Sequence, residues 1–416
     1  MSNLYERAPI DVSPPAQSPP AVPNLVDPKT YVEEDMDAVW RRLRAEDPVY
    51  WHSPTSEGPG FWVITKYHDI SRVLRDPERF TSQRGNVLST LLHGGDTGAG
   101  RMLAVTDGPH HTELRKLLLQ AFAPRALEGV AHRVHDTTRR LLTQALERGR
   151  CDFARDVASF IPLVTICDLL DVPQADRRDV LRLTKSALAS DYEKPEEDSD
   201  RMARGEILLY FTDLVAARRR APGTDPISLM ATAEVGGRPL SDEDIVLNCY
   251  SLIMGGDETS RLAMIGAVRA FIDYPDQWAA LKSGAATVEN AGEEVLRWVT
   301  PTMHFGRAAT TGVEVRDKRI GEGDLVTLWF VSGNRDEEVF PEADRFDLAR
   351  SANKHLALGY GPHFCLGGYL GRIEINAMLD GLRTLVGSIE EAGPPRRIYS
   401  NFLSGMSSLP VTLTPA

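Results

Sequence analysis

The stretch HLALGYGPHFCLGG, residues 355–368, places a single cysteine, Cys365, in a glycine-rich segment. Apolar residues then recur at helical spacing from Ile373 to Leu382, which predicts that Cys365 stands just ahead of a helix. Free N–H groups and the helix dipole at such a position favour a thiolate, so we expect a lowered thiol pKa. Gly359, Gly361 and Gly367 would let the backbone turn tightly and approach a flat, bulky group.

Three kinds of site could use this thiolate. A nucleophile would need a base, and His363 is the local candidate. Zinc would need further ligands, of which His363 is again the local one. Haem ligation needs one thiolate and cations for two carboxylates. The segment alone leaves all three open.

The same segment resembles the cysteine loop of the cytochrome P450 family, F-G-x-G-x-H-x-C-x-G. It matches that pattern at Gly359, Gly361, His363, Cys365 and Gly367. It departs at Leu358, where the family usually has phenylalanine, which puts the usual redox tuning in doubt. The resemblance implies a cytochrome P450 fold, haem b with Cys365 as the axial ligand to iron, and O₂ as co-substrate.

Cations for the haem carboxylates are implied by three further matches. His111 and Arg115 are one helical turn apart, as in the family's H-x-x-x-R pair. Arg307 follows Pro301 in the place of a second clamp. With His363, four donors would surround the two carboxylates, and charge-assisted contacts of that kind are strong where water is scarce.

A helix of unusual length is predicted from Ser241, a candidate N-cap, to Asp273, just before Tyr274 and Pro275. Gly255 and Gly256 in its middle indicate either a close helix crossing or a kink or groove beside a cofactor. Residues 255–260 resemble the family's A/G-G-x-D/E-T-T pattern, with Ser260 in place of the second threonine. The resemblance then implies that Glu258 and Thr259 are the catalytic acid–alcohol pair that delivers protons for oxygen activation.

Glu294 and Arg297 match the family's E-x-x-R motif, and at i,i+3 they share a helix face. The spacing alone is equally typical of a solvated surface pair, which contributes little. The resemblance implies a buried pair that holds the irregular segment before the cysteine loop. Arg345 or Arg350 is the expected third member.

The chain of 416 residues is predicted to be mainly α-helical with a smaller β-rich lobe. We expect a flexible proline-rich tail over residues 1–28 and a single domain over residues 29–416. Strand patterns near 49–65, 312–328 and 398–413 are assigned to the β-rich lobe, and Ser82–Gly100 to a long irregular loop.

The net charge of −12 argues against a nucleic-acid-binding protein. Cys151, Cys167, Cys249 and Cys365 are scattered without disulfide or metal spacing, which favours the reducing cytoplasm; the first three are expected to be buried. We predict no signal peptide and no membrane span, because apolar stretches are interrupted well before the ~20 residues that a span requires.

The resemblance implies a monooxygenase that inserts one oxygen atom by C–H hydroxylation or epoxidation. We expect a substrate from natural-product biosynthesis, free or bound to a carrier protein, a ferredoxin as electron donor at a basic patch of Arg115, Lys116 and Arg125, and a monomeric enzyme. Oxidative coupling, peroxide-driven oxidation and a non-catalytic haem-binding scaffold are the alternatives. The expected substrate pocket comprises Val87, Leu88, Leu252, Gly255, Met303, His304, Phe305, Phe402 and Leu403.

Overall fold

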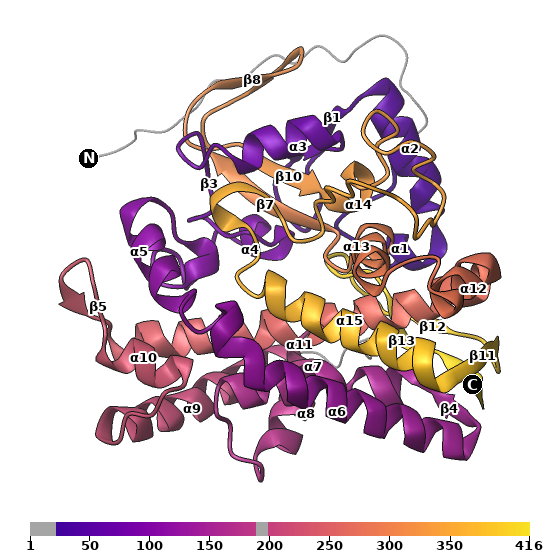
Figure 1. The fold of residues 1–416 in the computed structure, drawn as a ribbon. Coiled ribbons are helices and arrows are strands. Elements are labelled where there is room, and N and C mark those ends of the chain that lie inside the picture. The colour runs from indigo at the N-terminus through magenta and orange to yellow at the C-terminus, as the bar shows by residue number, and fades with distance from the viewer. Residues whose placement is uncertain (1–21, 189–198) are drawn as a thin grey trace, which may run out of the picture.

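A computed structural model describes residues 22–188 and 199–416 of the chain. The molecule divides into a large helical part and a smaller β-rich lobe, which lies at the top of Figure 1. This agrees with the predicted fold class. Within the described residues, no helix combines the length and the apolar character needed to cross a bilayer.

The β-rich lobe is built on a five-stranded sheet in the order β1-β2-β10-β7-β3. The strands are β1 Val49–His52, β2 Phe61–Ile64, β10 Leu325–Trp329, β7 His304–Ala309 and β3 Phe80–Thr81. Strand β10 runs parallel to β2 and antiparallel to β7. Around the sheet lie α1 Thr30–Glu33, α2 Met36–Glu46, α3 Tyr67–Leu74, α4 Leu88–Leu92, α14 Phe330–Gly333 and the hairpin of β8 Val313–Val315 and β9 Lys318–Ile320.

Both faces of this sheet are covered. Val326 and Leu328 of β10 belong to the core shared with α3, whereas Leu325 and Trp329 belong to the core shared with α2. The predicted strands near 49–65 and 312–328 are present, but β7 was missed. Its sequence, HFGRAA, does not alternate between polar and apolar residues, because all of it except the half-buried Phe305 is buried.

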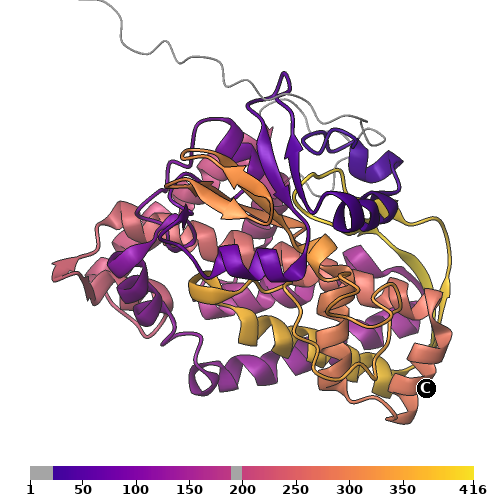
Figure 2. The same cartoon turned by 90° about the horizontal axis from the view of Figure 1, so that it is seen from above.

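The helical part surrounds α11 Asp242–Asp273, which crosses the molecule over about 48 Å (Figures 1 and 2). Its other helices are α5 Gly108–Leu118, α6 Pro124–Arg148, α7 Phe160–Leu169, α8 Arg177–Leu188, α9 Ser199–Arg220, α10 Pro226–Thr232, α12 Pro275–Ser283, α13 Val288–Val299 and α15 Gly368–Leu385. Residues 261–268 of α11 are buried on every side, as expected of a helix inside a helical core.

Helix α11 begins and ends where the sequence predicts. Ser241 caps it and forms a capping box with Asp244. The helix continues through the two glycines without a break. A Cβ at Gly256 would lie 3.0 Å from Ile166 of α7, whereas one at Gly255 would have no neighbour within 4 Å. Gly256 therefore permits a close helix crossing, and Gly255 leaves open space on another face.

The predicted strands near 398–413 do not join the five-stranded sheet, so their assignment to the β-rich lobe was wrong. Strand β14 Pro410–Pro415 lies between β11 Val386–Glu391 and β4 Arg150–Asp152. Its inward residues Val411 and Leu413 pack in the core of the helical part, which fixes the strand there. Two small pairs complete the strands: β12 Arg396–Arg397 with β13 Met406–Ser408, and β5 Glu234–Val235 with β6 Arg238–Pro239.

The chain is anchored earlier than the predicted end of the tail at residue 28. Residues 1–21 lie outside the described residues. Leu25, however, is fully buried and its N–H donates to Nε2 of His52 at 3.2 Å, while the hydroxyl of Tyr31 donates to the Leu25 carbonyl. The prolines on either side hid this short apolar anchor from a prediction based on composition.

Candidate cofactor site around Cys365

The segment before α15 folds back on itself in two tight turns. The Cys365 N–H donates to the Leu358 carbonyl at 2.8 Å, and Gly359 N–H donates to the Leu356 carbonyl at 2.7 Å. Gly359 and Gly361 have φ angles of +71° and +70°, a region that favours glycine. Gly367 does not share this feature, since its φ is −83°. It nevertheless lies in the turn that leads into α15, where Gly368 N–H donates to the Cys365 carbonyl at 3.3 Å.

Cys365 is exposed, whereas Cys151, Cys167 and Cys249 are buried as predicted. Although the residue as a whole is exposed, the protein groups around the sulfur partly desolvate it and raise the pKa of the Cys365 thiol, while the N–H of Gly367 and the charges of Arg115 and Arg372 oppose that rise. The net direction is upward. The predicted lowering was wrong for the protein alone, because desolvation outweighs the helix terminus.

The four predicted clamp residues converge beside this loop. The rings of His111 and His363 lie 4.3 Å apart, and Nη2 of Arg115 donates to the Phe364 carbonyl at 2.6 Å. Burial, reinforced by the charges of His363, Arg115 and Arg307, lowers the pKa of His111 to about 4. Segments far apart in the sequence thus bring their cations to one place, as the family resemblance implies.

Arg307 lacks, among the described residues, the acidic partner that a buried arginine usually has. Its side chain is 4% exposed, and its hydrogen bond goes to the neighbouring Gly306 carbonyl. Burial lowers the pKa of Arg307 to about 10. Nε2 of His111 is also buried without a partner in the described part of the chain. A buried cation and an orphaned imidazole call for an anion between them, and the carboxylates of haem fit that requirement.

The other two interpretations of Cys365 find less support in this geometry. Nε2 of His363 lies 2.7 Å from Oδ1 of Asp107, so the imidazole is held by a carboxylate at the start of α5. No described residues form a group of three or more His, Cys, Asp or Glu side chains placed to hold a metal ion. A nucleophile activated by His363 and a zinc site are therefore both disfavoured.

Asp107 was missed in the analysis of the sequence. Its carboxylate accepts from Thr81 Oγ1, Ser82 N and Ser82 Oγ in addition to His363. Desolvation raises the pKa of Asp107, but the hydrogen bonds from His363, Thr81 and Ser82 hold it well below its usual range. Asp107 is the N-cap residue of α5, but its side chain makes no capping hydrogen bond.

The predicted acid–alcohol pair lies on α11. The Thr259 hydroxyl donates to the Gly255 carbonyl at 2.9 Å. Glu258 is 1% exposed and accepts from Nε of Arg261 at 2.9 Å. The expected path from solvent through Glu258 is therefore occupied by an ion pair, which the sequence motif did not predict.

Glu294 and Arg297 of α13 are completely buried and joined by two hydrogen bonds. Arg297 also donates to the carbonyls of Asn334, Ala343 and Arg345, which fixes the irregular segment before the cysteine loop. Of the two expected third members, Arg350 reaches Glu294 at 3.3 Å, whereas the side chain of Arg345 is directed to Glu342.

Two of the predicted substrate-lining segments, residues 303–305 and 402–403, lie together. Met303 N donates to the Phe402 carbonyl at 2.9 Å, and the rings of Phe305 and Phe402 are 5.8 Å apart. Phe305, Phe402, Leu252 and Val87 are half-buried, and Gly255 is exposed. Met303 and Leu403 are almost fully buried.

Leu88 and His304 need correction as pocket residues, because both are 0% exposed. On β7, His304 faces the α2 side of the sheet and pairs in register with Trp329, whose ring centroid lies 4.4 Å away. Leu88 packs in the same core. Neither side chain has surface that a substrate could touch in this structure.

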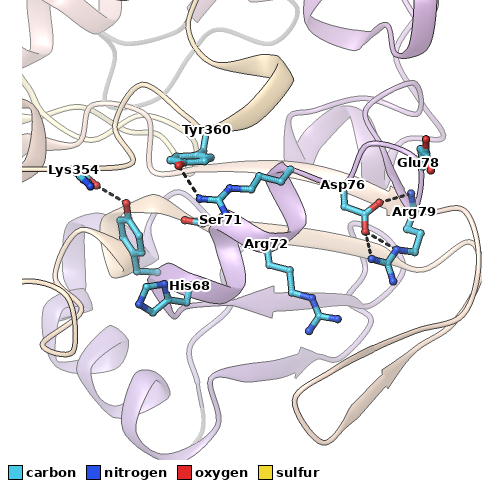
Figure 3. Close-up of a pocket in the computed structure, with 10 residues that line it drawn as sticks. His68, Ser71, Arg72, Asp76, Glu78, Arg79, Lys354 and Tyr360 are labelled. Atoms are coloured by element: carbon cyan, nitrogen blue, oxygen red, sulfur yellow. Dashed lines mark hydrogen bonds and ion pairs between the residues drawn. The ribbon is translucent and has the colours of Figure 1, made fainter.

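A basic hollow of about 810 Å³ opens next to the cysteine loop, between α3 with its following turn and Tyr360 (Figure 3). Arg75 donates to the Tyr360 hydroxyl at 2.7 Å and stacks over its ring, while Arg79 pairs with Asp76. Figure 3 shows Arg72 without a marked contact to the other residues drawn. A second hollow, of about 700 Å³, includes Arg115 and Lys116 and reaches the same loop at Gly361 and Pro362.

Comparisons with known proteins agree with this arrangement. The family model for cytochrome P450 matches residues 214–382. Cytochrome P450 NovI of Streptomyces niveus is 48% identical over 391 residues, covering 94% of this chain and 96% of NovI. Linalool 8-monooxygenase of Pseudomonas putida is 31% identical, covering 94% and 99%. The crystal structure of P450 OxyD, involved in the biosynthesis of vancomycin-type antibiotics, has a TM-score of 0.87 and 33% identity, covering 94% and 100%.

Proposed function

The chain belongs to the cytochrome P450 family and is a P450 monooxygenase, and from that premise we propose that it binds haem b through Cys365 and oxidises an intermediate of natural-product biosynthesis. The observation that carries the haem assignment is Arg307, a buried cation without a carboxylate partner among the described residues, beside the equally unpartnered Nε2 of His111. When bound, haem supplies the chemistry that places one atom of O₂ in a C–H or C=C bond and releases the other as water.

The chain's own residues hold the group and shield it. Arg307, His111, Arg115 and His363 would together surround the two haem carboxylates. Cys365 would supply the sulfur ligand to the iron, and the Gly367 N–H would donate a hydrogen bond to that sulfur. Gly359 and Gly361 keep the loop free of Cβ atoms on its turns.

Thr259 and Glu258 handle the protons. The Thr259 hydroxyl donates to the Gly255 carbonyl, so its oxygen lone pairs remain available to accept a proton from the cavity side. Glu258 is committed to Arg261, so it can pass a proton to this region only after that ion pair loosens. Proton delivery is then gated by the Glu258–Arg261 contact rather than by open access to water.

The substrate is proposed from the relatives and from the site together. OxyD belongs to the biosynthesis of an antibiotic class. The open space at Gly255 and the half-buried Phe305 and Phe402 would accept a large apolar skeleton. Hydroxylation or epoxidation of such a skeleton, free or attached to a carrier protein, is the proposed reaction.

Electrons are proposed to come from a ferredoxin that docks on the cysteine-loop side. Arg115 and Lys116 border one hollow, with the exposed Leu119 beside them, and Arg125 follows on α6. Arg72, Arg75, Arg79 and Lys354 border the other hollow (Figure 3). These cations oppose a net charge of −12, so they give an acidic donor one favourable face. The free cysteines fit a cytoplasmic monomer, which we also propose.

A reduced carbon monoxide difference spectrum tests the proposal directly. The purified protein should show the red-shifted band of thiolate-ligated haem, and C365H should bind haem without that band. Pathway intermediates, free and carrier-bound, should then shift the haem absorption spectrum of the wild type, and the shift should saturate with increasing concentration of the intermediate. Loss of the thiolate band in freshly folded wild-type protein would overturn the haem assignment. Activity with hydrogen peroxide but none with ferredoxin, reductase and O₂ would favour the peroxide-driven alternative.

A further inference from the structure

Asp107 stands at the point where three separate segments of the chain meet. Its carboxylate accepts from Thr81 Oγ1 at 2.7 Å, from Ser82 N at 2.7 Å and from Ser82 Oγ at 3.0 Å, all at the end of β3. The same carboxylate lies 2.7 Å from Nε2 of His363 in the cysteine loop. We propose that Asp107 is a positioning residue that fastens the segment 83–106 to the cysteine loop and sets the orientation of His363 beside the haem carboxylates.

The first half of this inference concerns the segment 83–106. Segment 83–106 begins after Ser82, which follows β3, and ends before Asp107, which precedes α5. The contact between Ser82 and Asp107 therefore joins the two ends of the segment. Segment 83–106 contacts β7 at Asn86, whose carbonyl accepts from Gly306 N–H at 2.7 Å. It reaches α11 through Leu103 N–H, which donates to Asn248 Oδ1 at 2.9 Å. A segment pinned at its base and at these two points is held in a defined position between β7 and the first turns of α11.

The second half concerns His363. Its ring packs against His111 at 4.3 Å and is held at Nε2 by Asp107. Rotation of the ring would break a charge-assisted hydrogen bond, so Asp107 decides which edge of the imidazole faces the cofactor. Both carboxylate oxygens of Asp107 are already engaged, which leaves Arg307 available for a haem carboxylate.

The predicted effect of Asp107 on haem binding rests on the proposed function, whereas its predicted effect on segment 83–106 does not. The contacts of Thr81 and Ser82 with Asp107 involve protein groups alone, so their effect on segment 83–106 can be measured without haem. The inference therefore predicts two separable consequences of removing the carboxylate: a looser segment 83–106 in the apoprotein, and weaker, differently tuned haem in the holoprotein.

The experiment compares D107A and the isosteric D107N with the wild type. Haem affinity is measured by titration of the apoprotein, exchange of segment 83–106 by hydrogen–deuterium exchange, and the midpoint potential by spectroelectrochemistry. D107A should weaken haem binding about tenfold, the effect of about 1.4 kcal/mol, and speed exchange in 83–106 about tenfold. D107N should have smaller effects than D107A on haem affinity and on exchange. It should raise the midpoint potential of the haem, because a negative charge near the cofactor is lost.

Matched variants separate positioning from general damage. E113Q removes the same charge from the helix that Asp107 precedes, at a residue whose carboxylate meets Gly236 N–H, and should leave all three readouts unchanged. In an H363A background, D107A should add less than threefold to the loss of haem affinity yet still speed exchange. S82A should speed exchange with little effect on the potential.

Two results would overturn the inference. One is haem affinity and exchange within twofold of the wild type in both D107A and D107N. The other is an additive effect of D107A and H363A on haem affinity, which would show that Asp107 does not act through His363. A wild type that binds haem without the thiolate band would instead contradict the proposed function, and the exchange measurement on the apoprotein would still decide the effect of Asp107 on segment 83–106.

Discussion

Glu258 and Arg261 form an ion pair inside α11, with Arg261 Nε 2.9 Å from Glu258 Oε2 and both side chains 1% exposed. Thr259, the neighbour of Glu258, directs its hydroxyl to the Gly255 carbonyl on the same helix. The acid of the expected proton pair is thus held by a partner one turn away. Stability and proton delivery become linked at this position, because both depend on the same carboxylate.

The variant E258Q tests the roles of Glu258 in stability and in proton delivery without changing the shape of its side chain. The amide keeps the size of the side chain but removes the negative charge that faces the buried Arg261, which costs up to about 3–5 kcal/mol of unfolding free energy. Turnover should fall at least tenfold. Chemical denaturation and oxygen consumption measure the two effects, and E258D, which keeps the charge, serves as the control. Wild-type stability together with wild-type turnover in E258Q would contradict the ion-pair gate.

Thr259 can be tested through its hydroxyl alone. T259A removes the oxygen, and T259S keeps it while removing the methyl group. We expect T259A to release a larger share of consumed O₂ as hydrogen peroxide, because a proton acceptor and donor next to the cavity is lost, whereas T259S should couple oxygen to product nearly as the wild type does. Equal coupling in T259A and T259S would show that the hydroxyl has no part in proton delivery.

Arg297 should not tolerate lysine. It donates to both oxygens of Glu294 and to three backbone carbonyls, a fork of contacts that a single ammonium group cannot reproduce. R297K should lower the unfolding free energy by about 3–5 kcal/mol and reduce haem incorporation. The exposed i,i+3 pair of Asp179 and Arg182 offers a comparison, since D179N should change stability by less than about 0.5 kcal/mol. Similar melting curves for R297K and D179N would refute the expectation.

The sequence specified elements whose signals are local. Ser241 and Tyr274-Pro275 bound α11 through capping and proline chemistry, and these act within a few residues. Strand β7 could not be found in the same way, because its pattern is set by two covering layers that meet only after folding. The fate of the strands near 398–413 likewise depended on β4 and β11, which pair with β14 only in the folded chain.

The residues of the candidate site also differ in whether a local signal in the sequence points to them. Residues inside the motifs of the family, such as His111 and Arg115, could be proposed as site residues because the family resemblance implies their roles. Asp107 could not, since its role depends on Thr81, Ser82 and His363 arriving from elsewhere. The pKa of Cys365 was misjudged for a related reason: a helix terminus is visible in the sequence, whereas the desolvation that opposes it arises from tertiary packing.

Leu358, where the family pattern has phenylalanine, lies against the loop at Gly368, where an added Cβ would be 3.5 Å from Leu358 Cδ1. L358F should lower the midpoint potential of the haem. A larger aromatic side chain shields the sulfur from water, and a drier environment disfavours the added negative charge of the reduced state. Spectroelectrochemistry measures the shift, and L358M, which preserves volume and apolar character, is the control. A higher potential in L358F would contradict the shielding argument.

His304 supplies a pH test that also checks its removal from the substrate pocket. Burial lowers the pKa of His304 to about 3, below its ordinary value of 6.5, and neither ring nitrogen has a partner among the described residues. The unfolded chain therefore takes up a proton between pH 6.5 and pH 3 that the folded protein refuses, so stability falls as the pH drops through that window. Between pH 7.5 and 5 the loss from this residue should be about 2 kcal/mol. H304L, of similar volume, should lose that part of the slope, whereas H93L, at an exposed histidine, should keep it. Denaturant unfolding at the two pH values measures the difference.

Because His304 faces Trp329, H304L should also leave the spectral response to substrate unchanged, and a weakened response would return His304 to the pocket.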